Sequence, residues 1–99
     1  MALTYVLKAR ARREIERAAV WWSANRLAAP GAVRKDVEEG LNILVEQPGL
    51  GVKVQTSRSA EVRRLLLDRT KYFLYYRVRG NELEVLSFWH SSREHGPSV

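Results

Sequence analysis

Basic side chains are concentrated in one stretch of the second half of the chain. Residues 53–79 hold eight Lys and Arg against two Asp and Glu, and this local excess equals the net charge of +6 of the whole 99-residue chain. Such a concentration points to an acidic partner, either nucleic acid or an acidic protein surface, although an ordinary solvated surface is the usual alternative. The cations that we single out are Arg63, Arg64, Arg69, Lys71, Arg77 and Arg79.

A second group of side chains near the C-terminus has the types that RNA cleavage requires. Attack of a 2′-hydroxyl on its phosphate needs a group that takes the proton and a cation that stabilises the developing charge. Histidine is a residue type that can serve as an acid or a base near neutral pH, and His90 and His95 flank Arg93. His90 can equally satisfy a hydrogen bond at a strand end. The candidate catalytic residues of a ribonuclease are Arg63, Arg64, Tyr76, His90 and Arg93.

Several classes of protein are excluded by what the sequence lacks. There is no cysteine, so a disulfide framework, a thiolate nucleophile and a thiolate metal site are all excluded. The spacing of His90, Glu94 and His95 does not place them on one face of a helix, and we expect no metal and no cofactor. No apolar run approaches the roughly 18 residues of a membrane span, and the first residues are too few and too polar for a signal peptide. We expect a cytoplasmic location with no membrane association.

Aromatic residues admit a structural and a functional interpretation. Of the neighbouring Trp21 and Trp22, the periodicity assigns Trp22 to the core and leaves Trp21 for an interface. Tyr72, Tyr75 and Tyr76 have the type that stacks on bases, but strands use tyrosine routinely for packing. We therefore expect mainly structural tyrosines, with Tyr76 as the first to mutate.

The first half of the chain predicts a strand and two helices. Leu3, Tyr5 and Leu7 alternate with other residues at the period of a strand. Residues 9–28 contain no Gly or Pro, and apolar residues recur there at helical spacing, which predicts a long amphipathic helix. Pro30 and Gly31 break it. A second helix, predicted from residue 30 onward by Val33, Val37, Leu41 and Leu44, ends before Pro48.

The second half predicts a sheet. The segment 48–59 is rich in turn residues and is expected to be a loop or an irregular strand. Residues 62–67, 72–78 and 82–89 are rich in β-forming residues and are separated by short turns, so they form two successive hairpins. We predict a single α+β domain over residues 1–99: an N-terminal strand, an antiparallel helical hairpin, then a three-stranded antiparallel meander, with both helices on one face of the sheet. The last strand is partly apolar on both faces, which favours a central or covered position.

This order of elements, together with particular residues, resembles the RelE/ParE toxin superfamily of type II toxin-antitoxin systems over nearly the whole chain. The resemblance depends on the combination of motifs and not on any one of them. The matching segments are Tyr5-Val6-Leu7, Leu44-Val45-Glu46-Gln47-Pro48 with Gly51, Val62-Arg63-Arg64-Leu65, Tyr72-Phe73-Leu74-Tyr75-Tyr76-Arg77-Val78, and Leu83-Glu84-Val85-Leu86 continuing to His90 and Arg93.

The resemblance implies one of two activities. RelE-like members cut messenger RNA on the ribosome, whereas ParE-like members inhibit DNA gyrase. RelE-like toxins carry a phosphate-binding arginine where this chain has Phe73, and the residues after Arg93 include no tyrosine. Both departures favour the ParE-like branch, while His90 and Arg93 fit either branch.

Three functions follow as hypotheses. The first is a ParE-like inhibitor of DNA gyrase, neutralised by a cognate antitoxin that covers the basic sheet face and the helical hairpin, with Trp21, Arg63 and Arg77 at that interface. Operator DNA is then contacted only through the antitoxin. The second is a RelE-like endoribonuclease that acts on the ribosome and mRNA, and the third is a non-toxic RNA- or protein-binding module. The proposed binding surface comprises Arg63, Arg64, Arg69, Lys71, Tyr76, Arg77, Arg79, His90 and Arg93.

The charge hypothesis makes one geometric prediction. Adjacent antiparallel strands place alternate side chains next to one another. We expect Arg63 and Arg77 to share a face, where their like charges need a carboxylate or a phosphate. The face of the sheet opposite the helices is then left for a partner.

Overall fold

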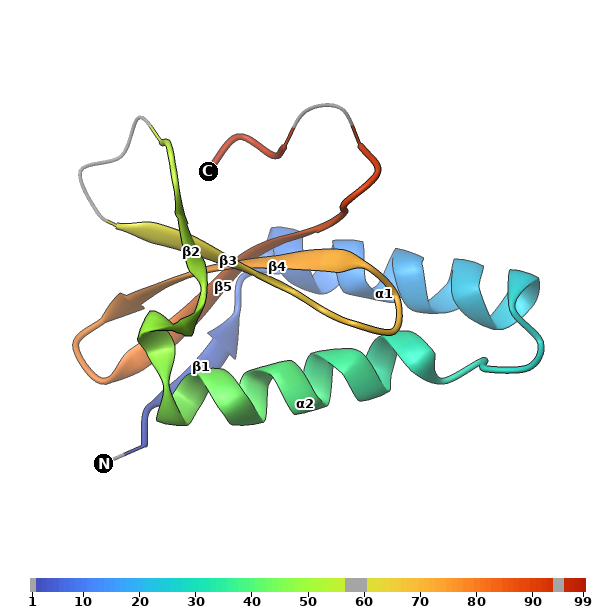
Figure 1. Ribbon diagram of the computed structural model, residues 1–99, viewed down its shortest axis with the longest axis horizontal. Helices are drawn as coiled ribbons and strands as arrows, with labels where there is room; N and C mark the ends of the chain where they lie inside the picture. The colour runs from blue at the N-terminus through green and yellow to red at the C-terminus, as the bar shows by residue number, and fades with distance from the viewer. Residues whose placement is uncertain (1, 57–60, 94–95) are drawn as a thin grey trace.

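The computed structural model describes residues 2–56, 61–93 and 96–99, and it consists of two helices and a five-stranded sheet (Figure 1). Strand β1 (Thr4–Leu7) leads into helix α1 (Ala9–Asn25) and helix α2 (Ala32–Glu46). A short 3-10 helix, η1 (Pro48–Leu50), precedes the remaining strands. These are β2 (Val52–Val54), β3 (Val62–Leu66), β4 (Tyr72–Arg79) and β5 (Glu82–His90).

The sheet has the order β1-β5-β4-β3-β2. Strand β1 runs parallel to β5, and the other neighbours are antiparallel. The predicted α+β fold, the helical hairpin and the two hairpins of β3, β4 and β5 are confirmed, and β5 is central as expected. The segment predicted as a loop or an irregular strand contributes β2 at the edge of the sheet, while its residues 57–60 lie outside the described residues.

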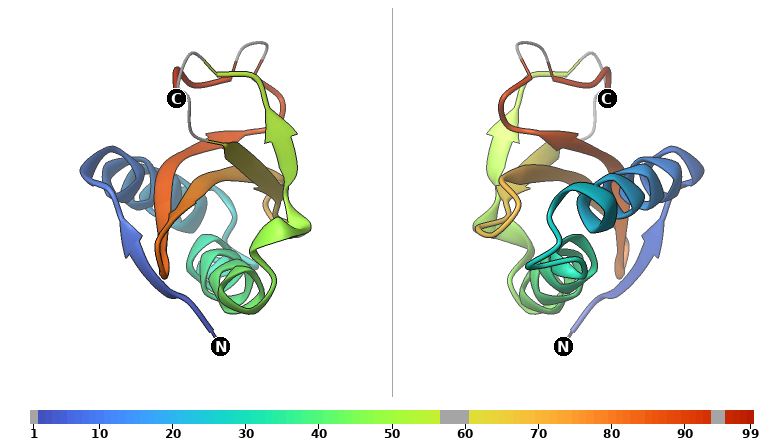
Figure 2. Two further views of the ribbon diagram at one scale, coloured as in Figure 1. Left: turned by 90° about the vertical axis from the view of Figure 1, so that its left-hand side faces the viewer. Right: turned by 90° about the vertical axis from the view of Figure 1, so that its right-hand side faces the viewer.

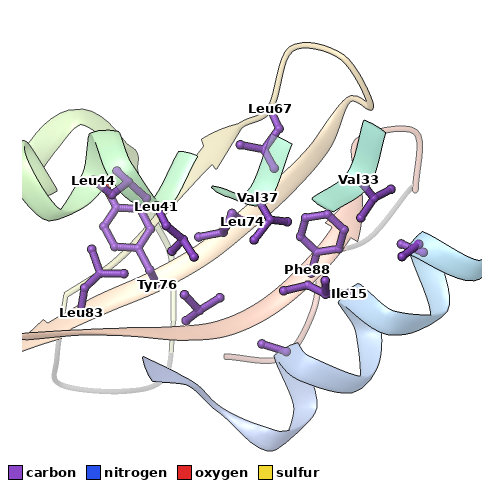
Figure 3. Close-up of a cluster of buried hydrophobic side chains, with 14 residues drawn as sticks. Ile15, Val33, Val37, Leu41, Leu44, Leu67, Leu74, Tyr76, Leu83 and Phe88 are labelled. Atoms are coloured by element: carbon purple, nitrogen blue, oxygen red, sulfur yellow. The ribbon is translucent and has the colours of Figure 1, made fainter. Parts of the chain in front are cut away.

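Each helix buries the apolar stripe that its periodicity predicts. The stripe of α1 includes Ala11 and Ile15, and that of α2 includes Val33 and Leu44, all buried against the sheet. Leu74 and Phe88 of β4 and β5 meet these stripes from the other side (Figure 3). Neither helix has a side-chain N-cap, so packing rather than capping stabilises them.

One buried carboxylate fixes the β3–β4 turn to α2. Asp36 of α2 is 3% exposed and accepts hydrogen bonds from the backbone N–H of Thr70 at 2.8 Å and from its hydroxyl at 2.8 Å. Arg69 adds an ion pair to the same carboxylate at 2.9 Å. The turn is therefore held by α2 and not by its own residues alone.

The two faces of the sheet have different covers. Helix α2 lies under one face, α1 runs beside β5, and the C-terminal residues lie over the other face (Figure 2). Ser98 accepts a hydrogen bond from the Arg10 guanidinium at 2.7 Å, and Val99 accepts one from the Thr56 hydroxyl at 2.6 Å. The chain therefore covers with its own last residues part of the face that the sequence predicts to be left for a partner.

Within the described residues, neither helix combines the length and the apolarity needed to cross a lipid bilayer.

Candidate functional site

Three strands place a group of aromatic and basic side chains on the face of the sheet away from α2. Arg64 of β3 lies directly opposite Tyr75 of β4, and Phe73 of β4 lies opposite Trp89 of β5. Directly opposed residues of antiparallel strands share a face, and Phe73 and Tyr75 are two residues apart. All four side chains therefore start from one face.

Arg64 is held by two aromatic rings. Its guanidinium carbon lies 4.0 Å from the centroid of the Phe73 ring, a cation–π contact. Its Nη1 lies 3.4 Å from the hydroxyl of Tyr75, which accepts a hydrogen bond from it. These contacts orient the guanidinium without neutralising its charge.

Arg93, which follows β5 in the chain, makes a similar cation–π contact with Trp89 of that strand. Its guanidinium carbon lies 4.5 Å from the centroid of the Trp89 ring. The indole N–H of Trp89 donates to Glu14 of α1 at 2.6 Å, and the same carboxylate accepts hydrogen bonds from the Ser87 hydroxyl at 2.6 Å and the Phe88 backbone N–H at 3.0 Å. Glu14 thereby fixes the ring that carries Arg93.

These side chains surround a hollow of about 320 Å³. No acidic residue is among those that the structure describes along its wall, so the hollow offers cations, hydrogen-bond donors and ring surfaces. An anion that carries a flat ring fits this chemistry best. We call it the arginine-aromatic hollow; its lining residues are Arg64, Phe73, Tyr75, Trp89, His90, Ser91, Arg93 and Gly96.

His90 lines the hollow, but its ring has a local partner. Its Nδ1 lies 2.7 Å from the Ser92 hydroxyl, and the Ser92 backbone N–H donates to the same nitrogen. Because Nδ1 accepts from that N–H, a neutral ring carries its proton on Nε2. His95, which the sequence places near His90, lies outside the described residues.

Arg63 and Arg77 do not share a face, so that geometric prediction is wrong. Arg63 lies directly opposite Tyr76 and shares its face of the sheet. Arg77 follows Tyr76 along β4, so its side chain points to the other face. Each arginine has its own carboxylate: Arg63 pairs with Glu61 at 2.8 Å, and Arg77 pairs with Glu84 at 2.6 Å. The Arg77 hydrogen bond holds the pKa of Glu84 below its usual value of 4.5, and the Arg63 hydrogen bond does the same to the pKa of Glu61.

Arg69 is also neutralised. It binds Glu39 of α2 through two hydrogen bonds at 2.9 and 3.2 Å, in addition to Asp36. The hydrogen bond from Arg69 holds the pKa of Glu39 below 4.5. Lys71, in a left-handed conformation with φ of 63°, and Arg79 are exposed. Of the described basic residues, Arg63, Arg69 and Arg77 therefore have carboxylate partners, and the register places Arg63 and Arg77 on opposite faces of the sheet.

Tyr76 lies in the core and not on a surface. It is 1% exposed, its hydroxyl donates to the Pro48 carbonyl at 2.7 Å, and it accepts from the Gly51 backbone N–H at 2.9 Å. Burial raises the pKa of Tyr76 above its ordinary value of 10.0. The hydroxyl fixes η1 to the sheet and is remote from the hollow, because Tyr76 faces the helices.

Of the candidate site residues, the structure brings together Arg64, His90 and Arg93. Phe73, Tyr75 and Trp89 complete the lining of the hollow, and Glu14 holds the Trp89 ring from outside it. None of these four was predicted as a site residue. The available signal was the spacing of Phe73 and Tyr75, which places both on one face of a strand together with the residue opposite Tyr75.

Two further sequence predictions concern Trp22 and metal binding. Trp22 packs against the core as predicted, while Trp21 is 48% exposed. In the part of the chain that the structure describes, no three His, Asp or Glu side chains gather to hold a metal ion.

Comparison with known proteins identifies relatives of this chain. Residues 5–95 match the family model described as the ParE toxin of type II toxin-antitoxin system, parDE. A solved structure described as the chromosomal ParDE TA system from P. aeruginosa is similar with a TM-score of 0.70 and 20% sequence identity, over 90% of this chain and 96% of that chain. At this identity the structural likeness concerns the fold alone. A search of curated proteins finds no match.

Proposed function

The chain belongs to the ParE toxin family of type II toxin-antitoxin systems, and on this premise we propose that it inhibits growth by binding DNA gyrase. The proposed activity is binding and not turnover. One observation carries this choice: of the five residues selected for RNA cleavage, Tyr76 and Arg63 are committed to structural contacts. The Tyr76 hydroxyl binds η1, and the Arg63 guanidinium binds Glu61 and the Gly51 carbonyl at 2.6 Å.

A cognate antitoxin is the second part of the proposal. A groove of about 410 Å³ lies between α1, α2 and β1, with Leu7, Ile15 and Leu41 among the apolar residues of its lining. Arg12, Glu16, Arg34 and Glu38 also line it, and Arg34 pairs with Glu16 across the two helices at 3.1 Å. An amphipathic antitoxin segment that orders on binding suits an apolar groove with charges of both signs. Trp21 remains a predicted antitoxin contact, and Arg63 and Arg77 would have to exchange their carboxylates to become contacts.

Expression in a bacterial host tests the proposal. The chain is induced alone and together with the antitoxin encoded beside it, while a DNA-damage reporter and the rate of protein synthesis are followed. We expect induction of the chain alone to stop growth, to activate the reporter and to produce filamentous cells before protein synthesis falls. Co-expression of the antitoxin should restore growth. Growth arrest without a DNA-damage response contradicts gyrase as the target.

A ribonuclease is the second candidate, and it has an observation in its favour. Arg64, His90 and Arg93 line one hollow, which supplies two cations and an imidazole. On this alternative, protein synthesis stops first and transcripts are cut. A non-toxic binding module, the third candidate, produces neither response. The same expression experiment therefore separates all three.

A further inference from the structure

A track of cations and rings extends from the arginine-aromatic hollow onto α1. A second hollow of about 340 Å³ shares Trp89, His90 and Arg93 with the first, and its lining continues to Arg17 and Trp21 of α1. The shared wall makes the two hollows neighbours, and α1 runs beside β5 at this point (Figure 2). We call the two hollows together the track.

The cations of the track are available to a ligand. Among the described residues, Arg17, Arg64 and Arg93 form no ion pair, in contrast to Arg63, Arg69 and Arg77. Among the described lining residues of the track, Glu14 is the acidic one. Its oxygens already accept from Ser87, Phe88 and Trp89, and Arg10 lies 3.6 Å from it. The net charge along the track is therefore positive.

The rings of the track are held in place. Glu14 fixes the Trp89 indole from behind, and Phe73 lies under the Arg64 guanidinium. Gly96 brings the C-terminal backbone against Tyr75, since a Cβ at this position would lie 3.0 Å from the Tyr75 hydroxyl. Trp21 stands at the other end, 48% exposed. Rings fixed beforehand lose little side-chain entropy on binding.

From this combination we infer that the track binds single-stranded nucleic acid. Phosphates would contact Arg64, Arg93 and Arg17. Bases would stack on the exposed Trp21 ring and on the guanidinium planes that lie over the Phe73 and Trp89 rings. A peptide of acidic residues alone, such as polyglutamate, supplies charges but no flat rings. A duplex keeps its bases stacked inside, out of reach of the rings. The track contains neither a groove-reading helix nor a set of side chains for one base, so binding without sequence preference is expected.

The inference goes beyond inhibition of gyrase, and it does not depend on it. The purified chain alone should bind single-stranded nucleic acid, without gyrase, antitoxin or ribosome. A chain that does not inhibit growth can therefore still bind single-stranded nucleic acid, and a chain that inhibits growth can fail to bind it.

Fluorescence anisotropy with labelled oligonucleotides of about 12 nucleotides, a length within the range that one small domain covers, tests the inference. The probes are oligo(dT) and oligo(U), and the variants are Arg64→Ala, Arg93→Ala and, as a control of equal charge outside the track, Arg79→Ala. We expect each track variant to weaken binding roughly tenfold and to reduce the salt slope by about 0.7, because one phosphate contact is lost. The affinity of Arg79→Ala should stay within about twofold of that of the unsubstituted chain, because this substitution changes only the long-range electrostatic attraction.

A ring variant separates stacking from charge. Phe73→Leu keeps the net charge, so we expect weaker binding with an unchanged salt slope. Urea unfolding of every variant identifies any loss that comes from misfolding. Binding of either oligonucleotide supports the site, and the tighter of the two identifies whether DNA or RNA is the preferred strand. No binding, equal losses for Arg79→Ala and Arg93→Ala, or equal competition by polyglutamate or by a duplex of matched charge overturns the inference.

Discussion

Carboxylate partners decide which arginines of this protein can bind another molecule. Arg77 is bound to Glu84, whose side chain is only 6% exposed, and Lys8 lies 3.6 Å from the other carboxylate oxygen. Arg64 and Arg93 lie on aromatic rings and keep their charge. A ring contact orients a guanidinium while leaving its hydrogen-bond donors free for a phosphate or a carboxylate.

The Arg77–Glu84 pair predicts a specific dependence of stability on pH. The pKa of Glu84 is lowered in the folded chain. The ionised carboxylate therefore contributes fully to the free energy of unfolding above about pH 4.5, and this contribution is lost as the pH falls through the lowered pKa. We expect Glu84→Gln to destabilise the fold by about 3 kcal/mol at pH 7, because it leaves Arg77 without its partner. Urea unfolding at several pH values should show that the difference in free energy of unfolding between the unsubstituted chain and Glu84→Gln becomes smaller below about pH 4.5.

The exposed pair of Lys53 and Glu61 provides the control for that experiment. Glu61 has a 52% exposed side chain and pairs with both Lys53 and Arg63. Its substitution by Gln should lower the free energy of unfolding much less than Glu84→Gln does, because solvent screens exposed ion pairs. If Glu61→Gln and Glu84→Gln cost the same, burial does not determine the strength of these pairs.

Tyr76 gives a second prediction at this scale. Tyr76→Phe removes the hydroxyl that joins Pro48 and Gly51, and we expect a loss of about 1–3 kcal/mol in the free energy of unfolding. Because the hydroxyl faces away from the arginine-aromatic hollow, growth inhibition at a permissive temperature should be unchanged. A folded Tyr76→Phe variant that has lost growth inhibition contradicts the structural role and favours the ribonuclease alternative.

At the scale of elements, the junction of η1 and β2 depends on a close backbone approach. A Cβ on Gly51 would lie 2.8 Å from the Arg64 carbonyl oxygen and 2.4 Å from the Tyr76 hydroxyl. We expect Gly51→Ala to destabilise the fold by about 1–3 kcal/mol, because a neighbouring backbone cannot move aside cheaply. Thermal unfolding measures the loss, with Gly49→Ala as the matched control, since a Cβ on Gly49 meets nothing within 4 Å. Equal stability of both variants contradicts the close approach.

The helices were predictable from the sequence, and the edge strand was not. Helix α2 shows its buried residues at helical spacing, as Val33, Val37 and Leu41 illustrate, because one apolar face must meet the sheet. Strand β2 spans three residues and exposes 68% of Val52. Its pairing with β3 is non-local, so neither periodicity nor composition distinguishes it from a loop. The parallel pairing of β1 with β5 is non-local in the same sense.

The candidate site was predictable only in part, for a related reason. Arg64, His90 and Arg93 stand out by residue type, and the sequence identified them. Phe73 was interpreted as the loss of a cation, whereas the register of β3 and β4 makes it the ring beneath Arg64. Glu14 lies 75 residues from the indole that it holds. Contacts of this kind depend on the complete fold.

At the scale of the whole molecule, net charge is a poor guide to where a partner binds. The excess of basic residues in 53–79 is a property of the sequence, but acidic residues of α2, β5 and the chain before β3 neutralise Arg69, Arg77 and Arg63 in the fold. The proposed partners occupy two of the concave surfaces: the groove between the helices, and the track on the sheet and α1. The two share no lining residue, so an antitoxin confined to the groove would leave the track open, whereas one that also contacts Trp21 would reach the end of the track.

DNA supercoiling by purified gyrase tests the central claim most directly. Relaxed plasmid, ATP and gyrase are incubated with increasing amounts of the purified full chain, with and without its antitoxin. We predict that the chain stops supercoiling at concentrations near that of the enzyme and that the antitoxin restores it. Undiminished supercoiling at a large excess of a chain that arrests growth in cells contradicts the claim.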